Sequence, residues 1–484
     1  MSQHRFDLIV VGGGPGGHAA AEEASRLGAR VCIIESNAWG GTCTHRGCIP
    51  TKALLTCSRH YAHLKRISRL GIRTDAPTFD FPAICRHRDQ MIRVAALGVE
   101  KSLQAAGVEM KSGWGEIFSP GEVVWTSSDG ARETFSAAGI VIAWGSEVSP
   151  PPFPIDAGPD LPPLREAAAP PSLQGGNQGT EQAPDLPPPL LSRVLTSDTF
   201  LQLTALPKSV VIVGGSVIGV EFATFLAELG TAVQLVEILP VLLPYEEEEA
   251  GEFLRKELAR LGVKVLTATA VTELREGSEG IRVAAAQNGK SLELVAEYAL
   301  LCTGRRPRLE GESLVRLGIG YDRRGIMVND RQETNVRGIY AVGDVTGGAM
   351  LAHRAMQQGQ ALAGRLFGDG SRVYREEFVP AVTYTHPPIA RVGLTERQAR
   401  ERGMDVEVHR SDYGASIMAR AELAGQGFVK LLWHTGQLVG ATIAGEGAPD
   451  LIAALSLAMT AGADMKTLRN WCIPHPTLSE VLKL

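Results

Sequence analysis

The chain has 484 residues and a formal net charge of −5. A length of this order is typical of about three domains of ordinary size. The slightly acidic balance argues against nucleic acid or an anionic membrane as the main partner. The seven cysteines are scattered along the chain, and their odd number argues against the disulfide framework of a secreted protein.

Neither a targeting segment nor a membrane span is expected. An apolar strand begins close to the N-terminus, without the charged region, long apolar core and cleavage site of a signal peptide. No run of about 18 apolar residues occurs, as a membrane helix would need. We therefore expect a soluble protein of a reducing compartment, namely the cytoplasm.

The first predicted unit is a strand over 6–11, a glycine-rich turn, a helix over 18–27 and a strand over 30–34 that ends at Glu35. Gly12, Gly14 and Gly17 have the Gly-x-Gly-x-x-Gly spacing, which lets backbone amides approach a pyrophosphate. An acid at the end of the second strand can accept hydrogen bonds from a ribose. The unit therefore predicts a dinucleotide site.

Two cysteines, Cys43 and Cys48, follow this unit directly. In a continuous helix they would be about 7.5 Å apart along the axis, whereas a disulfide needs Cα atoms roughly 4.4–6.8 Å apart. The pair can bridge only if Cys43 lies in a bent entry turn, and Gly40, Gly41 and Gly47 allow such a bend. A redox-active disulfide is one reading, and two unrelated thiols are the other. A zinc site would need two more ligands at matching spacing, which the sequence does not offer.

The region 150–190 is rich in proline, with 13 of the 28 prolines of the chain. This composition is typical of an extended linker. A tolerated surface insertion is favoured over a docking arm.

A second dinucleotide unit follows the linker. A strand over 209–213 leads into Gly214, Gly215, Ser216 and Gly219, then a helix to 229 and a strand over 232–236 that ends at Glu237. An acid at the ribose position favours NAD, because it would repel the 2′-phosphate of NADP.

Near the C-terminus, His475 lies between two prolines, and Glu480 follows five positions later. A carboxylate at this spacing can accept the second ring N–H of the histidine and fix its tautomer. Thiol exchange needs a group that takes a proton from one thiol and returns it to another, which suits histidine.

Taken together, these motifs resemble the flavoprotein disulfide reductase family, and within it the dihydrolipoamide dehydrogenases. Besides the two dinucleotide fingerprints, the matching segments in family order are 40–52, 302–307, 338–345, 350–353, 384–387 and 475–480. The resemblance implies an α/β fold with two Rossmann-like dinucleotide-binding domains, for FAD and NAD, and a C-terminal α+β dimerisation domain. The expected division is an FAD-binding domain with the redox disulfide over 1–149, the insertion or linker over 150–190, the NAD-binding domain over 191–280, a central segment completing the FAD site over 281–352, and the interface domain over 353–484.

The resemblance also implies the roles of individual residues. Cys43 would meet the substrate and Cys48 would face the flavin, while Lys52 and Glu221 would form an ion pair beside it. His475 and Glu480 would form an acid–base dyad in the partner subunit's site. FAD would be held by Gly12, Gly14, Gly17, Glu35, Gly41, Thr42, Lys52, Gly115, Gly145, Ser146, Asp344, Met350, Leu351, Ala352 and His353. NAD would be held by Gly214, Gly215, Ser216, Gly219, Glu237, Val271 and Gly304. No metal site is expected.

The implied activity is the oxidation of protein-bound dihydrolipoamide by NAD⁺ in a homodimer, with a lipoyl-carrying protein of a 2-oxoacid dehydrogenase or glycine cleavage system as partner. Two alternatives stay open. One is another NAD(P)H-dependent disulfide reductase. The other is a flavin-bearing redox sensor or scaffold subunit of a lipoyl complex, with little turnover.

Overall fold

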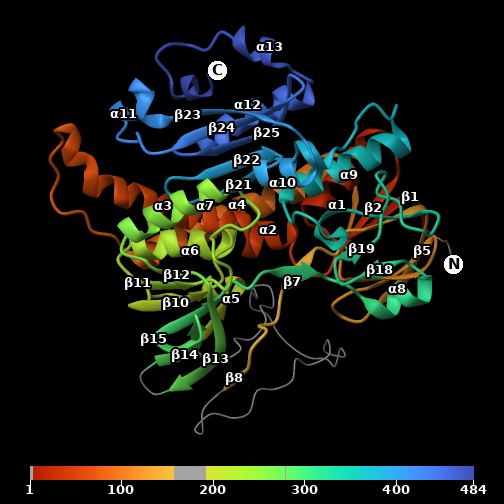
Figure 1. Ribbon diagram of the computed structural model, residues 1–484. Helices are drawn as coiled ribbons and strands as arrows, with labels where there is room; N and C mark the ends of the chain where they lie inside the picture. Colours follow the sequence, from red (N-terminus) through yellow and green to blue (C-terminus); the bar gives the residue numbers. More distant parts are fainter. Residues whose placement is uncertain (1–3, 157–191, 278–279, 484) are drawn as a thin grey trace.

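The computed structural model describes residues 4–156, 192–277 and 280–483. Three parts can be followed along the colours of Figure 1: a first nucleotide unit, a second nucleotide unit in green, and a C-terminal part in blue that lies above the helices of both. Most of the proline-rich segment expected at 150–190 falls outside the described residues. Among the described helices, none is both long and apolar enough to cross a membrane.

The first unit is built on a sheet in the order β3-β2-β1-β6-β5-β4, with β20 paired to β6. Its central strands β1, β2 and β6 are parallel and buried, as expected for a sheet covered on both faces. The strands are β1 (His4–Val11), β2 (Val31–Glu35), β3 (Glu109–Ser112), β4 (Trp114–Ser119), β5 (Glu122–Thr126), β6 (Arg132–Ile142) and β20 (Ile339–Ala341).

The helices of this unit are α1 (Pro15–Arg26), α2 (Gly41–Arg46), α3 (Cys48–Arg66), α4 (Phe81–Ala105), α8 (Gly311–Leu317) and α9 (Ala352–Phe367). Helices α1, α4 and α8 contact strands of the sheet, whereas α3 packs mainly against α4. Helix α9 crosses α1 so closely that a Cβ added to Gly359 would lie 2.4 Å from the carbonyl oxygen of Gly16. The small residues at this crossing explain why a segment from the C-terminal half returns to the first nucleotide loop.

The second unit has a parallel sheet in the order β12-β11-β10-β16-β9 and a smaller sheet in the order β15-β14-β13-β8. Its elements are β8 (Ile155–Asp156), β9 (Val194–Thr196), α5 (Ser197–Phe200), β10 (Ser209–Val213), α6 (Val217–Glu228), β11 (Ala232–Val236), α7 (Glu248–Arg260), β12 (Lys264–Leu266), β13 (Thr269–Gly277), β14 (Gly280–Gln287), β15 (Lys290–Ala296) and β16 (Tyr298–Leu301).

The structure differs from the expected division of the chain at one domain boundary, the end of the NAD-binding domain at residue 280. The division at residue 280 falls inside the antiparallel β13–β14 hairpin, and β16 pairs with β10 at the centre of the parallel sheet. The second unit therefore continues to residue 301. The antiparallel hairpin sits between two strands of one parallel sheet, and this crossover cannot be read from local sequence periodicity.

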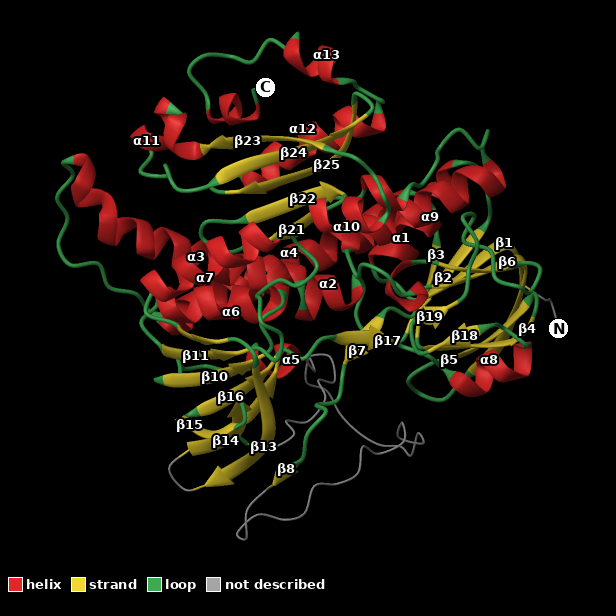
Figure 2. Ribbon diagram, in the orientation of Figure 1, coloured by secondary structure: helices red, strands yellow, loops and turns green. Residues whose placement is uncertain are grey.

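The C-terminal part is an antiparallel sheet in the order β21-β22-β25-β24-β23, with α12 packed on it (Figure 2). Its elements are β21 (Ala381–Thr383), β22 (Ile389–Gly393), α10 (Glu396–Glu401), β23 (Glu407–Asp412), α11 (Ile417–Ala421), β24 (Phe428–His434), β25 (Gln437–Ala444), α12 (Ala448–Thr460) and α13 (Met465–Arg469). A short antiparallel pair, β7 (Ser146–Val148) with β17 (Arg305–Pro307), links the two nucleotide units, and β18 (Tyr321–Asp322) pairs with β19 (Gly325–Ile326).

Candidate active site

A cavity of about 630 Å³ lies where the first unit, helix α6 of the second unit and the start of the C-terminal part meet. The start of α1, helices α2 and α3, and the start of β4 form one side of it. Segments 143–146, 342–344, 350–356 and 382–384 complete the wall. Residues that were expected in one site from distant motifs therefore share one cavity.

Both cysteines of the 40–52 motif line this cavity and are free thiols. The chain bends between them, because α2 ends at Arg46, Gly47 has φ −136° and ψ −107°, and α3 starts at Cys48. At the entry, Gly40 has φ +97°, a left-handed conformation that favours glycine. The bent entry turn that a bridge requires is thus present.

The two thiols are unequal. Cys43 donates a hydrogen bond to Cys48, and this bond is the main cause that lowers the pKa of Cys48 to about 7. Burial opposes the shift, and the nearby charge of Lys52 adds to it. The same hydrogen bond, followed by burial, raises the pKa of Cys43 above its usual range. In the dithiol, Cys48 therefore loses its proton first, while Cys43 keeps its own.

Lys52 and Glu221 form the expected ion pair, which joins α3 of the first unit to α6 of the second. The Lys52 ammonium lies 3.0 and 2.8 Å from the two carboxylate oxygens. The Tyr384 backbone N–H also donates to Glu221 over 2.9 Å, and Lys52 Nζ lies 4.7 Å from the centre of the Tyr384 ring. The contact of Tyr384 with Glu221 was missed from the sequence, because it is made by a backbone N–H, which the side-chain pattern of 384–387 does not reveal.

The first glycine turn fits a dinucleotide. A Cβ at Gly12 would lie 2.2 Å from the carbonyl oxygen of Ala143, and one at Gly17 would lie 1.9 Å from that of Gly12. Gly14, by contrast, has open space where a Cβ would point, and it starts α1 without a side-chain cap. The free amides of this helix start face the cavity, as a pyrophosphate requires.

Glu35 holds this turn in shape. Its carboxylate accepts hydrogen bonds from the backbone N–H groups of Gly13 over 2.6 Å and Asn37 over 2.7 Å. Each carboxylate oxygen has a second lone pair, so a ribose hydroxyl can still bind. Gly41 lies against the same turn, since a Cβ there would be 2.9 Å from the Gly14 Cα.

The remaining residues expected to contact FAD lie along the same cavity. Asp344 accepts a hydrogen bond of 2.6 Å from the Ser146 hydroxyl. The Arg305 guanidinium donates to Ser146 and pairs with the buried Asp198 at 3.3 Å. The other lining residues from the expected set are Thr42, Gly115, Gly145, Met350, Leu351, Ala352 and His353.

The residues expected to hold NAD lie around the second glycine turn and outside the 630 Å³ cavity. The geometry repeats that of the first turn. Glu237 accepts from the N–H groups of Gly215 over 2.6 Å and Leu239 over 2.8 Å. A Cβ at Gly214 would lie 2.3 Å from the carbonyl oxygen of Cys302, and Ser216 starts α6. Gly219 is on the first turn of α6, Val271 is on β13, and Gly304 follows β16.

His475 and Glu480 contact each other but lie outside the cavity. His475 Nδ1 is 3.1 Å from both carboxylate oxygens, and the imidazole is 73% exposed. Hydrogen bonds from Lys483 and then His475 lower the pKa of Glu480 to about 2. The dyad is therefore formed at the surface of the C-terminal part, away from the thiols of its own chain. Among the described residues, no group of three or more His, Cys, Asp or Glu is arranged to hold a metal ion.

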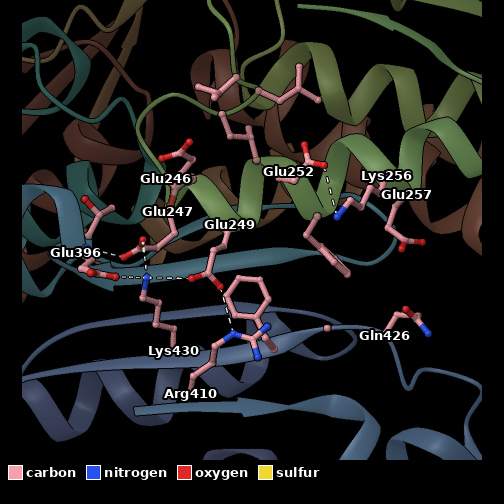
Figure 3. Close-up of a pocket in the computed structure, with 18 of the residues that line it drawn as sticks. Glu246, Glu247, Glu249, Glu252, Lys256, Glu257, Glu396, Arg410, Gln426 and Lys430 are labelled. Carbon is pink, nitrogen blue, oxygen red and sulfur yellow. Dashed lines mark hydrogen bonds and ion pairs between the residues drawn. The ribbon is translucent and has the colours of Figure 1, made fainter. Parts of the chain in front are cut away.

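A second cavity, of about 1030 Å³, lies between α7 and the C-terminal sheet (Figure 3). Lys430 is almost fully buried there, with its ammonium 2.6 Å from Glu396, 3.3 Å from Glu247 and 3.4 Å from Glu249. The carboxylates belong to the second unit and to the start of α10, so these ion pairs join two parts of the chain. Neither thiols nor nucleotide loops line this cavity among the described residues.

Comparisons with known proteins agree with this arrangement. Residues 6–359 match the family described as pyridine nucleotide-disulphide oxidoreductase, and residues 379–484 match its dimerisation domain. The chain is 33% identical to Dihydrolipoyl dehydrogenase 3 of Pseudomonas aeruginosa, over 99% of this chain and 96% of that protein. It is 34% identical to Dihydrolipoyl dehydrogenase of Thermus scotoductus, with the same coverage.

Solved structures share the fold. LpdA from Mycobacterium tuberculosis gives a TM-score of 0.85 at 24% identity, covering 99% of this chain and 98% of that one. The HOCl-induced flavoprotein disulfide reductase RclA from Escherichia coli gives 0.80 at 24% identity, covering 99% and 98%.

Proposed function

Because the chain belongs to the pyridine nucleotide-disulphide oxidoreductase family, we propose that it is a dihydrolipoyl dehydrogenase, which oxidises protein-bound dihydrolipoamide with NAD⁺. The observation that carries this proposal is the unequal Cys43–Cys48 dithiol. It lies in one cavity with the Lys52–Glu221 ion pair, between the first nucleotide turn and helix α6 of the second. Strained or accessible thiol pairs in such an environment are the reactive ones.

The residues present fit FAD in the cavity and NAD at the second glycine turn. The pyrophosphate of FAD would lie at the start of α1, with Glu35 at a ribose and Asp344 at the ribityl chain. Glu237 would occupy the ribose end of the NAD site, which favours NAD over NADP. When bound, FAD would supply the two-electron carrier between the Cys43–Cys48 dithiol and NAD⁺.

The thiol chemistry follows from the two pKa shifts. His475 of the partner subunit takes a proton from the substrate dithiol, and the resulting thiolate attacks the Cys43 sulfur of the oxidised enzyme. The Cys43–Cys48 bond breaks and a mixed disulfide forms. Cys48 leaves as the thiolate, which its pKa of about 7 favours. The second substrate sulfur then displaces Cys43 and its proton passes to the leaving Cys43, which gives the lipoamide disulfide, the Cys43 thiol, the Cys48 thiolate and protonated His475.

The active form of the enzyme is proposed to be a homodimer. The His475–Glu480 dyad does not line the cavity of its own chain, so the acid–base group must come from a second copy. The partner of the enzyme is proposed to be a lipoyl-carrying protein, and the odd number of scattered cysteines suits the cytoplasm.

Steady-state oxidation of dihydrolipoamide tests the proposed activity. Protein with an identified bound flavin should reduce NAD⁺ rapidly and NADP⁺ poorly, and Cys43→Ser should abolish turnover while the flavin stays bound. A flavin-loaded protein that does not oxidise dihydrolipoamide would overturn the proposal. It would point to another disulfide substrate or to a redox sensor.

Mixed dimers test where the dyad acts. Cys43→Ser and His475→Gln homodimers should both be inactive. A heterodimer, isolated through two different tags, contains one site with intact Cys43 from one chain and intact His475 from the other. Activity in the heterodimer is expected if the dyad serves the neighbouring subunit. An inactive heterodimer would place the dyad's action within its own chain.

A further inference from the structure

Glu310 lines the 630 Å³ cavity proposed to hold FAD, and the thiol chemistry described above gives it no role. It precedes α8, and its side chain, 18% exposed, caps no backbone amide of that helix. It lines the cavity together with Trp114 and Arg308. No motif in the sequence singled it out.

The carboxylate of Glu310 has no hydrogen-bond partner among the described residues. The closest cation, the Arg308 guanidinium, is 3.9 Å away, which is beyond hydrogen-bond distance. Glu116 on β4 also faces it, but Glu116 is paired with Arg316 of α8 at 2.9 Å. The oxygens of Glu310 are not among the buried atoms that lack a partner, so water can reach them, and a ligand that fills the cavity would displace this water and leave the carboxylate in need of a donor.

The surroundings place Glu310 at the nucleoside end of the cavity. The Arg308 guanidinium lies 5.6 Å from the centre of the Trp114 ring, and the backbone N–H of Arg308 donates to the Gly145 carbonyl over 3.0 Å. Gly113, which precedes Trp114, donates to the Glu35 carbonyl over 2.8 Å. Through Trp114 and Gly113, Glu310 is thus connected to Glu35, the residue proposed to bind the ribose, whereas the thiols belong to α2 and α3.

We propose that Glu310 binds the adenine amino group of FAD by accepting a hydrogen bond from it. The inference rests on the proposed function, because it requires FAD in this cavity. The adenosine half of FAD offers two kinds of donor, the ribose hydroxyls and the adenine amino group. Glu35 stands at the ribose, so the amino group is the donor left for Glu310.

This assignment makes FAD affinity depend on pH. Burial is the main cause that raises the pKa of Glu310 to about 7, with Glu116 adding to it and Arg308 opposing it. A donor from the ligand stabilises the ionised form and lowers that pKa in the complex. Binding therefore releases a proton near neutral pH, and affinity falls as the pH drops below about 7.

The test measures ligand binding to the flavin-stripped full-length protein. Glu310→Ala should weaken the binding of FAD and of ADP by about tenfold, which is the loss of affinity expected when one charge-assisted hydrogen bond is removed. It should leave IDP, which lacks the amino group, unchanged. Glu312→Ala is the matched control, because Glu312 is exposed on the same helix and does not line the cavity.

The proposal would be overturned if Glu310→Ala lost affinity equally for ADP and IDP, or if it lost affinity for neither. If Glu310→Ala does not fold, Glu310→Gln serves instead. That variant keeps an acceptor but cannot titrate, so the fall in FAD affinity between pH 8 and pH 6 should vanish, and its persistence would overturn the assignment. A wild-type chain that binds no FAD would refute the proposed function itself, a result distinct from these.

Discussion

At the scale of single residues, the reactivity of the site depends on which thiol loses its proton. Lys52 contributes to the lowered pKa of Cys48, while Glu221 opposes it. In Lys52→Met the favourable charge is lost and the carboxylate remains, so the pKa of Cys48 should rise from about 7 by roughly one unit or more. The rate of Cys48 alkylation against pH, followed by mass spectrometry on the reduced protein, measures this shift.

Cys57 provides the internal control for that experiment. It lies on α3 with Lys52, but only burial raises its pKa. Its alkylation profile should be the same in both proteins. An unchanged midpoint for Cys48 would mean that the charge of Lys52 is fully compensated by Glu221.

At the scale of elements, helix α6 supplies two carboxylates that hold the redox helix. Glu221 binds Lys52, and Glu228, two turns later, binds the Ser58 hydroxyl at 2.6 Å and His386 at 2.8 Å. The position of α6 depends on Gly219, where a Cβ would lie 1.9 Å from the carbonyl oxygen of Gly214. Gly219→Ala should therefore displace the start of α6 and weaken NADH binding by at least about tenfold, while FAD stays bound. Titration of NADH against the flavin-loaded variant measures the loss.

The same substitution at Gly98 is the control. Gly98 is exposed within α4, and a Cβ there would meet nothing within 4 Å. Alanine is favoured over glycine in a helix by up to about 1 kcal/mol, so Gly98→Ala should leave NADH binding unchanged and stabilise the fold slightly. Unaltered NADH binding in Gly219→Ala would show that the glycine turn tolerates the added methyl group.

At the scale of the whole molecule, the second unit and the C-terminal part are joined by the buried ion pairs of Lys430. Although burial opposes it, Glu396, Glu247 and Glu249 raise the pKa of Lys430. Lys430→Met would leave the buried Glu247 without its cation, while Glu249 and Glu396 would keep Arg410 and Arg400 as partners. Breaking a buried pair in this way costs about 3–5 kcal/mol. We expect a marked fall in Tm, measured by thermal unfolding at neutral pH.

Lys256→Met is the comparison within the same cavity. Lys256 pairs with Glu252 at 3.5 Å, but its side chain is 61% exposed. Surface pairs of this kind contribute about 0–1 kcal/mol, so its Tm should stay close to that of the wild type. Equal losses in the two variants would mean that burial of Lys430 has no energetic consequence.

Local sequence was sufficient to locate both glycine turns with their acidic residues and to pair His475 with Glu480, while the chemistry of that dyad stays a prediction. Each rests on residues within about 30 positions of one another, whose spacing reflects strand, turn and helix geometry. Only the tertiary structure decided that β16 returns to the second unit, that Tyr384 and Arg305 complete the ion-pair network, and that Glu310 lies in the cavity. It also decided that His475 stays away from the thiols of its own chain. Such contacts join segments far apart in sequence, and packing between elements determines them rather than the preferences of any one segment.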